Sequence, residues 1–143
     1  MGPVTTTSAE QGAILGRFNT LWRVSGSLRT PVGWPNAQFT PPNDAAWCEI
    51  RVNRQGAFNR AWTGTDKLIR HPGLVTVDIR APLNQGDKVA LELGDAAAGI
   101  FRNVTFDGIT FRAPTVRDFG PDGPWYRVQV DCPYWRDSIH THA

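Results

Sequence analysis

The sequence predicts an α+β domain in which two helices pack on one face of a mostly antiparallel sheet of about five strands. Two stretches place apolar residues at helical spacing, and the remaining apolar segments alternate as half-buried strands do. The predicted order is helix, strand, strand, helix, strand, strand, strand. The chain has 143 residues, so we expect a single domain over 1–143 with an ordered core over about 8–137.

The first predicted element is an amphipathic helix over residues 8–22. Thr and Ser residues precede it, and Ile14, Phe18 and Trp22 recur on one helical stripe. The following segment, 25–46, contains six Gly or Pro residues, which predicts an ordered loop.

Two strands are predicted next, over 46–52 and over 67–79. The segment between them, 53–66, is interpreted as a long loop of the kind that often carries function. The run of His71, Pro72 and Gly73 is expected to interrupt the second strand, because proline cannot donate a ladder hydrogen bond.

The remainder predicts a helix and three strands. Asn84 is a suitable cap for a second helix, and its apolar stripe runs to Phe101. Asp107 and Gly108 then predict a tight hairpin turn, since both accept positive φ angles. A Gly, Pro and Asp-rich loop over 118–124 is expected to lead into a final strand ending at Asp137. The tail beyond Asp137 shows no core pattern and is expected to fray.

Composition argues against several function classes. The formal net charge is only +2, from 15 basic and 13 acidic residues with no basic run, which is too weak on its own to indicate a nucleic-acid-binding protein. Thirteen of the basic residues are arginines, which suits a protein interface, although a GC-rich coding bias explains it equally well. No apolar run is long enough to span a membrane. The first residues have neither the basic segment nor the apolar segment of a signal peptide, so none is expected.

The sequence contains no convincing catalytic, cofactor-binding or metal-ligating set. Cys48 and Cys132 lie in predicted strands and are expected to be reduced core thiols. His140 and His142, on either side of Thr141 in the tail, are too few for a structural zinc site, so no role is assigned to that tail. His71 is the remaining histidine, and no oriented nucleophile accompanies it. We therefore predict that the protein is not an enzyme and needs no cofactor.

An ordered series of residues resembles the phage tail terminator-like family, the tail completion proteins of long-tailed phages and of gene transfer agents. The resemblance covers about residues 8–137. It rests on Trp34, Pro35 and Asn36, on Phe39 to Pro42, on Trp47, Thr63, Gly64, Gly73, Val75 and Pro82, and on the closing run from Trp125 to Tyr134.

The resemblance implies a structural virion protein at the neck end of the tail, assembled in the host cytoplasm. Such proteins form a ring, usually a hexamer, on the head-proximal end of the tail tube. The ring stops polymerisation of the tube and presents a docking surface to the head connector. The implied partners are copies of the chain, the tube protein and the connector, with DNA only as passing cargo and no membrane. Two alternatives remain open: a head–tail joining protein, or a monomeric binding module with an aromatic groove.

The predicted interface with the tube or a neighbouring subunit lies in the 53–66 segment. Its residues combine arginine with large aromatic rings, the types that dominate protein interfaces. They are Arg54, Phe58, Arg60 and Trp62. The alternative is that Phe58 and Trp62 fold back onto the core. Exposed edge strands offer a second route to subunit pairing.

Overall fold

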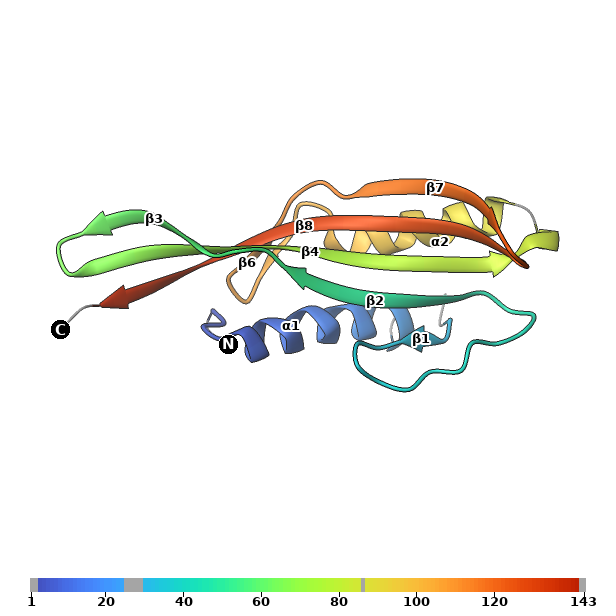
Figure 1. The fold of residues 1–143 in the computed structure, drawn as a ribbon, viewed down its shortest axis with the longest axis horizontal. Coiled ribbons are helices and arrows are strands. Elements are labelled where there is room, and N and C mark those ends of the chain that lie inside the picture. Colours follow the sequence, from blue (N-terminus) through green and yellow to red (C-terminus); the bar gives the residue numbers. More distant parts are fainter. Residues whose placement is uncertain (1–2, 25–29, 86, 142–143) are drawn as a thin grey trace.

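The computed structural model describes residues 3–24, 30–85 and 87–141. Its helical elements are α1 (Thr7–Asn19), continued by a π-helical turn (Thr20–Val24), a 3-10 turn (Leu83–Gln85), and α2 (Asp87–Phe101). Its strands are β1 (Val32–Gly33), β2 (Trp47–Arg54), β3 (Phe58–Thr63), β4 (Asp66–Pro82), β5 (Thr105–Phe106), β6 (Ile109–Phe111), β7 (Thr115–Asp122) and β8 (Trp125–Thr141), as Figure 1 shows.

The strands form one mixed sheet of eight, so the predicted number of about five was too low. Two 17-residue strands, β4 and β8, pair antiparallel from Asp66 opposite Thr141 to Pro82 opposite Trp125. Strands β2 and β3 flank β4, whereas β6 and β7 flank β8. The single parallel pair described is β1 with β2.

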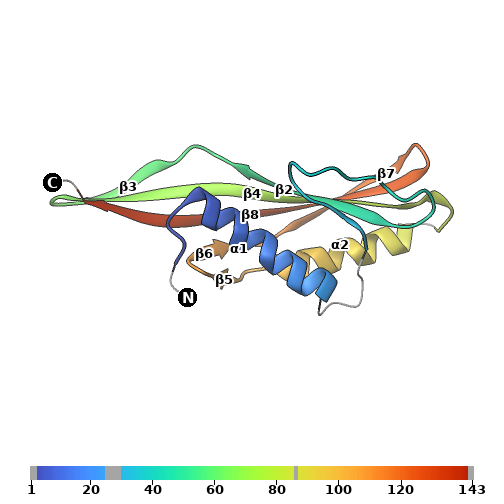
Figure 2. The same ribbon diagram turned by 90° about the horizontal axis from the view of Figure 1, so that it is seen from below.

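Both helices lie on the same side of the sheet (Figure 2). Thr6 caps α1 by accepting a hydrogen bond from the Ala9 amide at 3.1 Å. Ile14, Phe18 and Trp22 are fully buried in one cluster with the inward side chains of the strands, as their spacing predicted. Helix α2 sits close to β8 because Gly94 has no side chain, and a Cβ there would lie 3.0 Å from Val128 Cγ1. The predicted α+β class is confirmed.

The predicted long loop over 53–66 was wrong. Strand β2 continues to Arg54, and Phe58–Thr63 pairs with β4 as a hairpin that turns at Gly64, where φ is 58°. A bulge between Asn59 and Ala61 shifts the pairing register. The extra residue interrupts the two-residue alternation by which a strand is recognised in a sequence.

The predicted interruption at His71–Gly73 was also wrong, since β4 is continuous. The Pro72 carbonyl accepts a hydrogen bond from the Gln55 amide at 3.0 Å, so the Pro72 nitrogen faces the same gap between the end of β2 and the start of β3. No ladder hydrogen bond is lost there. A Cβ at Gly73 would clash with the Tyr134 ring, which packs directly against the backbone.

Two further boundaries differ from expectation. Residues 118–122 belong to β7, which pairs with β8 through a bulge between Asp118 and Gly120. Ser138–Thr141 does not fray but pairs with Asp66–Ile69, while His142 and Ala143 lie outside the described residues. The predicted turn at Asp107 and Gly108 is confirmed, with φ angles of 49° and 79° between β5 and β6.

Candidate interaction surface

One end of the sheet extends as a three-stranded arm past the helices (Figure 1). We define the arm as β3 together with residues 66–70 of β4 and 137–141 of β8. Neither helix covers it, so the arm has no hydrophobic core of its own. A ribbon this narrow owes its order to the long strands that continue into the helix-covered sheet, which we call the body.

The arm carries three large apolar side chains that solvent reaches. Phe58 is 51% exposed, Trp62 63% and Ile139 69%. Beside Ile139 is a shallow hollow of about 190 Å³, lined by Ala61, Asp66, Leu68 and Ile139. Trp62 is in register with Lys67 and therefore lies on the opposite face of the arm. Exposed apolar side chains gathered in one region that no helix covers are typical of a protein-binding region.

Cationic side chains cover two of the aromatic rings near the arm. The Lys67 ammonium lies 4.1 Å from the centre of the Trp62 ring, and the Arg70 guanidinium lies 3.8 Å from the Trp135 ring. Arg70 also donates two hydrogen bonds, of 3.0 and 3.1 Å, to Asp137. These bonds hold the pKa of Asp137 below its usual value and raise the pKa of Arg70.

A chain of hydrogen bonds links two histidines across the base of the arm. The Ser138 hydroxyl lies 2.8 Å from His71 Nε2 and 3.2 Å from His140 Nε2. Partial burial lowers the pKa of His71, and the nearby charges of Arg136 and His140 act in the same direction. The hydroxyl is therefore shared between two imidazoles, in contrast to a catalytic serine, whose histidine is oriented by a carboxylate.

Glu10 fastens the start of α1 to the strands where the arm meets the body. It is 1% exposed, and its carboxylate accepts hydrogen bonds from Arg136 Nε at 2.7 Å and from the Tyr134 hydroxyl at 2.9 Å. Arg54 Nε forms a third contact with Glu10 at 2.8 Å. The buried carboxylate is thus paired with two guanidinium groups.

The face of the sheet that points away from the helices is charged but largely neutralised by itself. Arg127 donates two hydrogen bonds to Asp78, at 2.9 and 3.1 Å, and Arg117 pairs with Asp131 at 2.8 Å. Asp78 and Asp131 are buried under these long side chains, although no helix covers them. The arrangement satisfies its own charges and offers no concentrated field for a charged ligand.

The four predicted interface residues divide into two groups. Phe58, Arg60 and Trp62 lie together on β3 of the arm, and the exposure of both rings excludes the alternative in which they fold back on the core. Arg54 ends β2 instead, where it contacts Glu10 and donates a hydrogen bond to Gln11 at 2.9 Å. The prediction that Arg54 lies in a functional loop was wrong. Whether these residues contact a partner stays a prediction.

Sequence reasoning missed Ile139 and Leu68, which lie on the same face of the arm as Phe58. They face each other across β8 and β4. The tail was expected to fray, so Ile139 was left unassigned. The alternation of Ile139 between polar neighbours is the only sequence signal for this strand, and three residues are too few to make it distinctive.

Both cysteines lie in the core of the body. Cys48 and Cys132 are buried, and burial raises the pKa of each thiol to about 12, so both stay protonated at neutral pH. Within the described ranges no group of three or more His, Cys, Asp or Glu side chains could hold a metal ion. None of the described helices is long and apolar enough to cross a membrane.

The fold and this surface define a small α+β protein whose body pairs its own charges and whose arm leaves large apolar side chains exposed. The family model described as phage tail terminator protein matches residues 12–134, so the chain belongs to that family and has a structural role in a phage tail. Among solved structures, one chain shares the fold with a TM-score of 0.63 at 18% sequence identity, over 96% of this chain and 99% of that chain. No curated protein matches the chain.

Proposed function

We propose that the protein forms a ring on the head-proximal end of the tail tube, stops the addition of tube subunits and presents a docking surface to the head connector. The family match over residues 12–134 carries this proposal. The action is mechanical: the protein occupies the end of a polymer and needs neither a cofactor nor a chemical step. DNA passes through the ring as cargo, and the weak net charge of +2 suits a passage that does not retain it.

A ring requires each subunit to offer two different surfaces, one for each neighbour. The arm supplies one candidate surface, because Phe58 and Trp62 remain exposed on a strand that no helix covers. The outer edge of β3 also has backbone groups available for pairing with another strand. A hexamer is the expected size of the ring, by resemblance to the family.

Purified tube protein offers a direct test of the capping role. Tube subunits are polymerised alone and with increasing amounts of this protein, and tube lengths are measured by electron microscopy. The proposal predicts shorter tubes with extra density at one end. Tubes of unchanged length, with bare ends, contradict it.

The same experiment distinguishes a tail terminator from the alternative, a head–tail joining protein. A joining protein binds the connector and leaves the length of growing tubes unchanged. A terminator limits tube length in the absence of any connector. The order of addition therefore distinguishes them: tubes grown with the protein before the connector is added are short only for a terminator.

A further inference from the structure

We propose that the arm of one copy docks on the opposite end of a second copy of this chain. That end comprises the C-terminal part of β4, the 3-10 turn at Leu83–Gln85 and the hairpin between β7 and β8, and we call it the hairpin end. The inference rests on the proposed ring, and it names the two surfaces that meet between neighbouring subunits. Figure 1 shows the two regions at opposite extremes of the molecule.

The exposed apolar side chains are divided between these two extremes. Of the six large hydrophobic side chains that are exposed in the described part of the chain, Phe58, Trp62 and Ile139 lie on the arm. Leu83 and Phe119, which are 43% and 50% exposed, lie at the hairpin end. The sixth, Leu21, lies elsewhere, in the π-helical turn that follows α1. Two separated apolar surfaces fit a contact in which different surfaces meet, as a ring requires.

The charges of the two regions are complementary. The arm with its base, residues 54–71 and 134–141, contains five basic and two acidic residues, and Glu10, which pairs with Arg54 and Arg136, adds a third acidic residue there. The hairpin end with the adjoining segments, residues 40–49, 78–92 and 117–127, contains seven acidic and four basic residues. Opposite net charges on the two surfaces favour docking of the arm on another copy's hairpin end and oppose contact between two arms.

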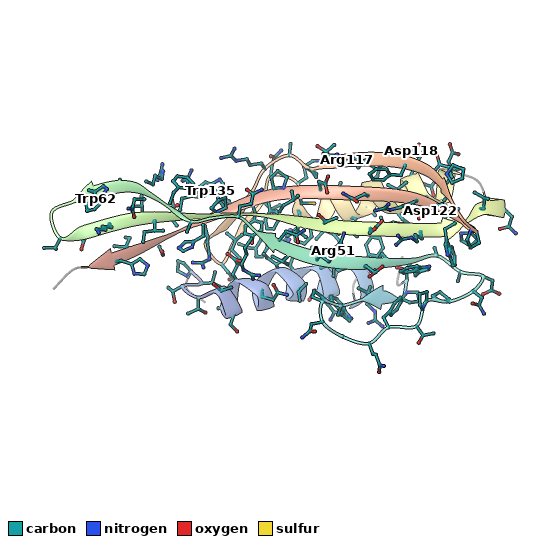
Figure 3. The ribbon with its side chains drawn as sticks, in the orientation of Figure 1. Arg51, Trp62, Arg117, Asp118, Asp122 and Trp135 are labelled. Atoms are coloured by element: carbon teal, nitrogen blue, oxygen red, sulfur yellow. The ribbon has the colours of Figure 1, made fainter. Side chains whose placement is uncertain are left out.

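Several of these charges are available for a partner. On the arm, the side chain of Arg60 is 48% exposed and makes only a long contact of 3.4 Å with Asp137. At the hairpin end, the side chain of Asp122 is 54% exposed and lies 3.8 Å from Arg80. Figure 3 shows Trp62 near one extreme of the molecule and Asp122 near the other.

A hollow at the hairpin end matches the most exposed aromatic group of the arm. It has a volume of about 320 Å³ and is lined by Asn43, Asp44, Pro82, Leu83, Asn84 and Pro124. The proline and leucine side chains can pack against an aromatic ring, and the Asp44 carboxylate can accept an ammonium group. The Trp62 ring with the Lys67 ammonium above it, 4.1 Å from the ring centre, presents these two features together.

Charge-swapped variants test this contact. The arm variant is R60E/K67E, and the hairpin-end variant is D44K/D122K. The control for the arm variant, R51E/R102E, makes the same change in charge as R60E/K67E at two exposed positions outside both surfaces. Masses are measured by light scattering across a range of concentrations, with circular dichroism and thermal melting to verify folding.

Wild type and control are expected to form rings. Each charge-swapped variant alone should remain at the 15.8 kDa mass of the monomer. Mixed in equal amounts, the two variants should assemble again, because every arm then meets a hairpin end of opposite charge. The combined variant carrying all four changes should also recover assembly on its own.

Rings formed by either variant alone, or a folded mixture that stays monomeric, would overturn the proposed contact. An arm variant that forms rings but no longer binds the tube would overturn it too, because the arm would then contact the tube protein. The capping role is judged separately by tube length. Wild-type rings that leave tubes uncapped would contradict that role without affecting the arm contact.

Discussion

The body and the arm are built on the same pair of strands, β4 and β8, yet the two regions differ in what surrounds those strands. In the body, the inward side chains of both strands are apolar and fully buried, as at Val77 and Val130, under two helices. In the arm, the same ladder continues without a cover, and Ile139 is 69% exposed. The difference indicates that burial in the body supplies most of the free energy of folding, and it supports the proposal that the arm takes part in association.

Truncation of a core ring should have the largest effect on stability. Phe101 is fully buried and stacks on Phe18 and Phe111, with ring centres 6.4 and 4.7 Å away. We expect F101A to lower the free energy of unfolding by about 3–5 kcal/mol, through lost burial and the cavity left behind. Urea denaturation measures this change. A loss below about 1 kcal/mol would mean that packing around Phe101 contributes little to the stability of the fold.

Removal of the Glu10 carboxylate, where the arm meets the body, should have the second-largest effect on stability. E10A leaves Arg136, which is 3% exposed, without its buried partner. Breaking such a buried pair lowers the free energy of unfolding by about 3–5 kcal/mol. We expect a loss in the lower part of that range, because Arg54, which contacts the second oxygen of Glu10, has a side chain that is 33% exposed.

The matched variant R54Q removes only the more exposed partner of Glu10. It should cost about 1 kcal/mol or less, because solvent already screens that pair. Chemical denaturation of both variants checks the ranking, and equal costs would contradict the role assigned to Arg136.

Acidification should weaken the base of the arm before it affects the body. Partial burial, with Arg136 and His140 nearby, lowers the pKa of His71 below 6.5, while the charges of Glu10 and Asp137 act in the opposite direction. The unfolded chain therefore binds a proton more readily than the folded one. The stability that neutral His71 contributes is present above pH 6.5 and is lost as the pH falls from there through its lowered pKa.

Thermal melting between pH 7.5 and 5 tests this titration. The wild type should lose stability over that range, and H71Q, which keeps a polar group beside Ser138, should lose less. An identical pH dependence in both proteins would assign the effect to other groups, such as the Asp137 carboxyl. The pKa of Asp137 is lowered by Arg70, so its contribution is lost only in more acidic solution.

Truncation of the exposed arm ring should have the smallest effect on stability. Trp62 is 63% exposed and contacts Lys67 at 4.1 Å, so W62A should change the free energy of unfolding by about 1 kcal/mol or less. The same variant should clearly weaken self-association, measured as the ring dissociation constant by light scattering. Unchanged association with unchanged stability would remove Trp62 from the interface.

The body could be predicted from the sequence much better than the arm. Helical spacing identified Ile14, Phe18 and Trp22 as core residues, because a buried helix face repeats in the sequence. The Asp107–Gly108 turn was located from its two residues, because few residue types accept the positive φ angles that it requires. The arm lacks a buried face, so its strands show no sustained alternation. The bulge beside Arg60 and the proline in β4 obscured what signal remained.

The candidate surface was therefore chosen by residue type and assigned to a loop, whereas the structure places three of its four residues on a strand. Phe58, Arg60 and Trp62 were chosen because exposed aromatic and arginine residues suit interfaces, and the structure brings them onto one strand. Arg54 was chosen on the same ground, but its buried partner Glu10 lies 44 positions earlier in the sequence. A contact over that separation depends on the tertiary fold and leaves no local pattern.

Amide hydrogen exchange, followed by mass spectrometry in the free and the assembled protein, tests most directly whether the arm is the part that associates. The amides of β3 and of residues 137–141 should exchange quickly in the monomer and become strongly protected in the ring, whereas the core amides of β4 near Val77 should change little. Protection that appears elsewhere on assembly, with the arm still exchanging as in the monomer, would contradict the account.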